Sequence, residues 1–230
     1  MPPREAASGY AMLALVWKDL VLEARSRETL PALFVLGLLV LVIFDFSLAL
    51  KPEETGRFAA GILWVSILFA SVLSLGRTFL VEREGSCIEG LMTSPMDRGS
   101  IYLAKLAVNL LLLVAFELLL LPVFSLMYGV WLGANVAGLL VVVAGGTIGI
   151  AATGTLFALA ALGTRAREMV LPLLVLPLQI PLLIAAAQAT QMVLGGSGLA
   201  ALGMRVDIIA GFDVVMVTGG WMLFEFVLVD

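Results

Sequence analysis

Few side chains in this sequence could carry out covalent chemistry. The chain contains no histidine, and Cys87 is its only cysteine. The lack of histidine excludes His-ligated haem, the usual zinc sites and Ser–His or Cys–His nucleophile pairs, and a single cysteine excludes an internal disulfide. The phosphate-binding pattern G-x-x-x-x-G-K-[ST] does not occur either, so any ATP would have to be hydrolysed by another chain. We therefore expect a non-catalytic protein that binds no cofactor firmly.

Carboxylates gather in one charged segment, LVEREGSCIEGLMTSPMDRGSIYLAK, at residues 80–105. Ser86 and Glu89 form a capping-box pair, which predicts that a short helix begins at this serine. The apolar side chains between Ile88 and Met92 would share one face, and Pro95 would end the helix after about two turns. Such a helix could dock into a groove of a cytosolic motor subunit, or it could be an ordinary capped helix in a solvated loop.

Glu117 is the second group of interest, because it lies within a long apolar stretch. A carboxylate in mid-membrane costs roughly 2.5 kcal/mol or more unless it is protonated, paired or in contact with water. Lys105 lies twelve residues earlier, about 18 Å along a helix, and cannot be its partner. Glu117 is expected either to line a substrate path or a subunit contact, or to form a structural hydrogen bond to a neighbouring helix. Asp213, in contrast, is expected at the outer end of its span.

The elements that carry these residues are membrane spans. The chain has 230 residues, of which 62% are hydrophobic and only 13% are charged, and this composition excludes a water-soluble domain. A net charge of −4 argues against nucleic acid as a partner. We expect an all-α, polytopic membrane protein that forms one permease domain over residues 1–230. Its six predicted transmembrane helices cover residues 31–50, 59–79, 101–128, 136–163, 169–194 and 208–229.

The distribution of positive charge predicts the orientation in the membrane. With both termini in the cytoplasm, only Lys51, Arg57 and Arg205 of the 13 Lys and Arg residues would lie outside. Residues 10–28 show the period of an amphipathic helix, which would either lie on membrane lipid at the inner leaflet or form a docking surface for a partner. Trp17 and Lys18 would then be interfacial.

Several stretches of the chain together resemble a known family. The segment at 80–105 is similar to the coupling-helix region of ABC-2 type transporter permeases. The stretches KDLVLEARSRE, GILWVSILFASVLSLGRTF, GTIGIAATGTLFALAALGTRARE and LPLLVLPLQIPLLIAAAQAT resemble cytochrome c maturation protein B (CcmB), the haem exporter permease family. These stretches cover most of residues 18–190, whereas the last 40 residues carry little that can be matched.

The resemblance implies a function and a set of partners. The chain would be a subunit in the bacterial cytoplasmic (inner) membrane that pairs with a separate ATP-binding subunit, CcmA, and works with CcmC and CcmD in cytochrome c biogenesis. Its function would be haem export, or ATP-driven release of haem from a membrane-bound chaperone, with haem as the substrate. Lys105 would anchor the start of the third span near the inner interface. The residues that the resemblance implies in coupling to the ATPase are Glu82, Glu84, Gly85, Ser86, Glu89, Leu91 and Pro95.

Other classes of function fit parts of the sequence. A generic ABC-2 exporter of lipid, polysaccharide or drug would share the coupling helix but would need no cytochrome pathway. An ion-coupled carrier would use Glu117 and would run without ATP, whereas an ABC permease would need a second chain for any ATPase activity. Opposite two motor subunits we expect either a second copy of this chain or another membrane subunit.

Overall fold

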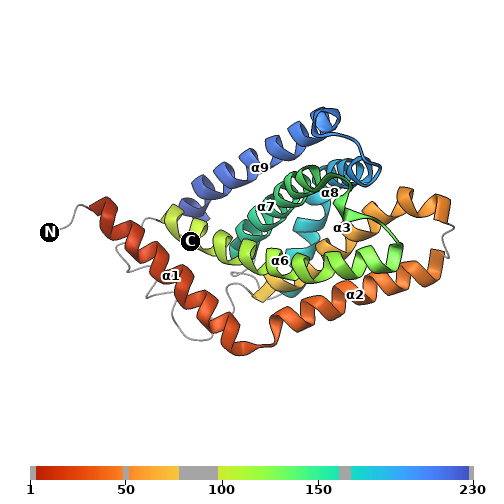
Figure 1. The fold of residues 1–230 in the computed structure, drawn as a ribbon. Coiled ribbons are helices and arrows are strands. Elements are labelled where there is room, and N and C mark those ends of the chain that lie inside the picture. The colour runs from red at the N-terminus through yellow and green to blue at the C-terminus, as the bar shows by residue number, and fades with distance from the viewer. Residues whose placement is uncertain (1–3, 49–51, 78–97, 161–166, 228–230) are drawn as a thin grey trace.

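The computed structural model describes residues 4–48, 52–77, 98–160 and 167–227, and these residues are helical wherever they have regular structure (Figure 1). The all-α class expected from the sequence is thereby confirmed. Seven α-helices and one short 3-10 helix make up the described part. They are α1 (Arg4–Ser26), α2 (Thr29–Leu48), α3 (Pro52–Arg77), α6 (Arg98–Tyr128), η1 (Leu132–Asn135), α7 (Val136–Ala160), α8 (Arg167–Leu194) and α9 (Leu199–Val227).

Five of the described helices are long and apolar enough to cross a membrane. They contain the stretches Thr29–Leu48, Phe58–Gly76, Gly99–Tyr128, Leu132–Ala158 and Leu171–Leu194. The sixth predicted span, residues 208–229, falls in α9 as far as residue 227, and α9 is not among the five. This helix carries Arg205, Asp207 and Asp213 within its described part. Six spans with both termini inside therefore stay a prediction.

Local sequence explains where α8 ends and where α9 begins. Helix α8 ends in a Schellman motif, in which the amide of Ser197 donates to the carbonyl of Met192 at 2.9 Å and the amide of Gly196 donates to Val193 at 3.0 Å. Gly196 has φ +81°, a conformation that glycine adopts without steric cost. Helix α9 then starts at Leu199 and is broken at Gly203, which has non-helical φ and ψ. The three prolines of α8 leave it one helix over Arg167–Leu194.

Helix α7 occupies the centre of the bundle and packs against α3, α6, α8 and α9 (Figure 1). Its glycines make this possible, because added Cβ atoms would collide with neighbouring side chains. A Cβ on Gly145 would lie 2.6 Å from Ile209, one on Gly149 would lie 2.6 Å from Asp213, and one on Gly146 would overlap the ring of Trp64.

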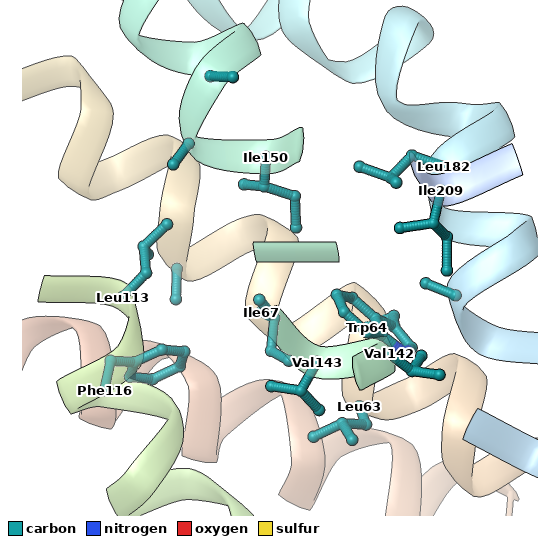
Figure 2. Close-up of a cluster of buried hydrophobic side chains, with 14 of the residues drawn as sticks. Leu63, Trp64, Ile67, Leu113, Phe116, Val142, Val143, Ile150, Leu182 and Ile209 are labelled. Atoms are coloured by element: carbon teal, nitrogen blue, oxygen red, sulfur yellow. The ribbon is translucent and has the colours of Figure 1, made fainter. Parts of the chain in front are cut away.

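Apolar side chains from all five of these helices meet in the core that Figure 2 shows. The Trp64 ring is 1% exposed, and its indole nitrogen donates to the hydroxyl of Thr190 on α8 at 2.9 Å. The hydrogen bond satisfies the one polar atom of a side chain that otherwise fills apolar space. The labelled core residues are Leu63, Trp64 and Ile67 of α3, Leu113 and Phe116 of α6, Val142, Val143 and Ile150 of α7, Leu182 of α8 and Ile209 of α9.

Candidate functional site

The seven residues expected to form the coupling helix all lie outside the described residues. They are Glu82, Glu84, Gly85, Ser86, Glu89, Leu91 and Pro95. Helix α6 begins at Arg98, three residues after the last of them. The structure therefore describes α6, the helix that follows this segment in the chain. It also describes Glu117, Lys105, Trp17 and Lys18.

Helix α6 makes polar side-chain contacts with four other helices. Five of its residues do so, and we call them the α6 polar row. Counted from the N-terminal end of the helix, the row consists of Tyr102, Lys105, Asn109, Glu117 and Tyr128. These contacts determine how α6 is connected to the rest of the bundle.

The first contact of the row ties α6 to α1. The Nζ atom of Lys105 donates to Oδ2 of Asp19 at 2.7 Å, and the lysine side chain is only 2% exposed. The same carboxylate lies 3.1 Å from Nζ of Lys18, whose side chain is 43% exposed. Lys105 was expected to anchor α6 near the inner interface, and the structure shows that α1 covers it. A buried ammonium requires such a counter-charge.

Two further members of the row tie α6 to α7 and α9. Asn109 donates from its amide nitrogen to the hydroxyl of Thr155 on α7 at 2.8 Å. The Tyr102 hydroxyl lies 3.2 Å from the carbonyl oxygen of Ala152 on α7 and 3.3 Å from that of Met216 on α9. One phenol thus reaches both helices at the end of α6 that follows the expected coupling segment.

Glu117 is 2% exposed and contacts α7. The Thr147 hydroxyl lies 2.6 Å from Oε1 of Glu117 and 2.7 Å from the carbonyl oxygen of Val143. This is the hydrogen bond to a neighbouring helix that was one of the two expectations for Glu117. At the far end of the row, the Tyr128 hydroxyl donates to the carbonyl oxygen of Leu41 on α2 at 2.9 Å.

Asp213 lies deeper than the sequence suggested. Its position in the chain predicted exposure at the outer end of a span, whereas the residue is half-buried. The carboxyl group packs over Gly149 near the middle of α7, and its Oδ1 atom is buried without a hydrogen-bond partner among the described residues. The small-residue surface of α7 allows α9 to come this close.

Helix α1 presents an apolar stripe on the side that faces away from α6. Tyr10, Leu13 and Trp17 are 76%, 66% and 71% exposed. Asp19 follows Trp17 by two residues, which on a helix places the two side chains about 200° apart. One side of α1 thus holds the ion pair with Lys105, while the opposite side leaves large apolar groups uncovered by the described residues.

Sequence reasoning identified Lys105 and Glu117 but missed Tyr102, Asn109 and Tyr128. Asn109 offered a signal, since it is a lone amide in an apolar stretch and lies one helical turn after Lys105. Tyrosines near the ends of a span are commonly interfacial, so their sequence positions predicted no helix–helix bond. Within the described residues, no group of three or more Cys, Asp or Glu side chains could hold a metal ion.

Comparison with known proteins assigns a family. Residues 10–223 match the family model described as CcmB protein. Heme exporter protein B of Rhodobacter capsulatus is 30% identical over 193 residues, which cover 82% of this chain and 85% of that protein. The proteins of the same name from Paracoccus denitrificans and Pseudomonas aeruginosa are 32% and 33% identical over 187 and 159 residues, covering 78% and 68% of this chain and 82% and 70% of theirs. The chain therefore belongs to the CcmB family.

Proposed function

We propose that this chain is the membrane permease subunit of an ABC-type complex in cytochrome c biogenesis, and that a separate chain hydrolyses the ATP that drives it. The observation that carries this proposal is the family match over residues 10–223, together with relatives that are named heme exporters. The chain's own residues agree with a non-catalytic role, because its sequence has no phosphate-binding loop and no histidine.

Coupling would enter the bundle through α6. The residues expected to form the coupling helix end at Pro95, three residues before α6 begins, so a push on this segment would act on α6 through a short connection. The polar row then connects α6 to α1, α2, α7 and α9 by side-chain contacts of 2.6 to 3.3 Å. Since packed helices move as rigid elements, these contacts would pass a displacement of α6 to the central helix α7 and its neighbours.

Haem would be the substrate, exported or released from a membrane-bound chaperone. Met, Tyr and Cys87 are the side chains of this sequence that could ligate iron, and the expected place of Cys87 is cytoplasmic. Firm haem ligation would therefore fall to a partner. The partners that we propose are a CcmA-like ATP-binding subunit, CcmC-like and CcmD-like membrane proteins, and either another membrane subunit or a second copy of this chain.

The proposed location is the bacterial inner membrane, with six spans and both termini in the cytoplasm. Helix α9 would supply the sixth span. Helix α1 would lie on the inner leaflet with Tyr10, Leu13 and Trp17 in lipid and Lys18 near the headgroups, because its exposed apolar stripe points away from the bundle. A generic ABC-2 exporter is less favoured, since the relatives are named heme exporters.

An ion-coupled carrier that uses Glu117 is also less favoured. The carboxyl group is 2% exposed and lies against Thr147 of the neighbouring helix, and both features are typical of a structural contact between helices. A carrier needs its ionisable group to reach water from each side in turn.

The coupling proposal is tested by the double variant Glu84→Ala, Glu89→Ala. We expect it to lose co-purification with the ATP-binding subunit and stimulation of that subunit's ATPase, because both carboxylates flank the docking helix. The matched control is Glu53→Ala, Glu54→Ala, which removes two carboxylates from the side expected to face outward. Equal ATPase stimulation by the two double variants, at equal membrane levels, would contradict the proposed docking helix.

A further inference from the structure

Arg205 is a cation of α9 that has no partner in the described part of the chain. Its Nε atom is buried and makes no hydrogen bond there, and the side chain as a whole is half-buried. A guanidinium stays charged under all physiological conditions, and its donors are costly to leave unsatisfied when water cannot reach them. No group of the described residues occupies this donor, so we expect Arg205 to bind a negatively charged group that they do not supply.

The packing of α9 on α7 locates Arg205 along the bundle. Ile209 lies over Gly145 and Asp213 lies over Gly149. A shift of four residues along α9 therefore corresponds to a shift of four residues along α7. One interval earlier, Arg205 falls beside Val141, about five residues or 8 Å along α7 from its first residue. This end of α7 adjoins η1 and the turn between α8 and α9.

Neither Asp213 nor Asp207 of α9 forms an ion pair with Arg205. Asp213 is eight residues further along the helix, a separation of about 12 Å. Asp207 follows Arg205 by two residues, which places it about 200° around the helix, and it is exposed. Neither of these carboxylates is therefore placed to neutralise Arg205.

Exposed apolar side chains neighbour this position along both helices. Leu140 and Val141 of α7 are 64% and 41% exposed, and Met204 and Ile208 of α9 are 74% and 40% exposed. A cation beside exposed apolar side chains matches an amphiphile that joins an anionic headgroup to hydrocarbon. Phosphate fits a guanidinium through paired N–H···O bonds, and a membrane supplies phosphate at the ends of its spans.

We propose that Arg205 binds the phosphate of a membrane phospholipid and that the acyl chains of this lipid lie on Leu140, Val141, Met204 and Ile208. The bound lipid would complete the packing of α9 against α7 at the end where α9 is broken at Gly203. This inference does not depend on the proposed function, because it concerns only how α9 is held.

The test measures lipid binding to the purified protein in mild detergent. Native mass spectrometry would count bound phosphatidylglycerol at rising lipid concentration for the wild type, Arg205→Gln and Arg205→Lys. We expect Arg205→Gln to weaken binding about tenfold to a hundredfold, the range expected for the loss of a charged hydrogen bond, and Arg205→Lys to weaken it less. The matched control, Asp207→Asn, changes an exposed charge on the same turn and is expected to bind as the wild type does.

Three results would overturn the proposal. Equal phosphatidylglycerol binding by the wild type and Arg205→Gln would show that Arg205 does not hold the headgroup. Thermal stabilisation of the wild type by inorganic phosphate alone, to the same extent as by phosphatidylglycerol, would point to a site for a free anion. Displacement of phosphatidylglycerol by haem in the wild type would assign the site to haem propionates. Maturation of c-type cytochromes tests the proposed function separately.

Discussion

The buried contact between α1 and α6 leads to a quantitative prediction. Oδ2 of Asp19 lies 2.7 Å from Nζ of Lys105, whose side chain is 2% exposed, whereas Lys18 reaches the same carboxylate at 3.1 Å with 43% exposure. A hydrogen bond to a buried charged group contributes about 1.5–3 kcal/mol, and an exposed ion pair contributes about 0–1 kcal/mol. Asp19→Asn should therefore lower the free energy of unfolding by about 2 kcal/mol, and Lys18→Met should lower it by less than about 1 kcal/mol.

A double-mutant cycle separates this contact from other effects of the substitutions. Lys105→Met removes the same contact from the other side, so the variant with both substitutions should cost about 1–2 kcal/mol less than the sum of the two single variants. The free energy of unfolding would be measured by titrating protein in dodecylmaltoside micelles with sodium dodecyl sulfate and recording tryptophan fluorescence. The reasoning is refuted if Asp19→Asn costs no more than Lys18→Met, or if the effects of Asp19→Asn and Lys105→Met are additive.

Two further predictions concern the centre of the bundle. Gly146→Ala should lower the free energy of unfolding by about 3 kcal/mol, because its Cβ would overlap the buried ring of Trp64. The control is Gly61→Ala, whose Cβ would meet nothing within 4 Å. In the same titration this variant should be neutral or more stable by about 0.5–1 kcal/mol. Glu117→Gln should keep the contact with Thr147 and retain full maturation of c-type cytochromes in a haem stain, whereas loss of maturation at a normal protein level would support a carrier that uses this carboxylate.

Local properties of the sequence predicted the helical class and the general position of the apolar segments. Charge-free runs of sufficient length can only be helices in a bilayer, because the backbone must satisfy its own hydrogen bonds there. The G-x-x-x-G spacing of Gly145 and Gly149 is typical of a close helix approach, and α9 does come close there, because a Cβ on either glycine would lie 2.6 Å from an α9 side chain. Glycines directly after an apolar helix are typical of a helix end, and Gly196 adopts the positive φ that such a cap needs.

The partners of the buried polar residues could not be predicted in this way. Asn109 and Thr155 are 46 positions apart, and Asp19 and Lys105 are 86 positions apart, so each pairing depends on how whole helices pack. Asp213 was expected near the end of a span because hydropathy gives only the limits of an apolar stretch, and not how its residues pack against other helices. The structure instead places its carboxyl group over Gly149, where α9 packs closely on α7.

The most direct test of the central claim is a haem stain of covalently bound c-type cytochromes after deletion of the gene for this chain. A subunit of the haem export system is needed for their maturation, so we expect the stained bands to disappear and to return when the wild-type gene is restored. Stained bands of normal intensity in the deletion strain, with no second copy of the gene present, would contradict a role in cytochrome c biogenesis.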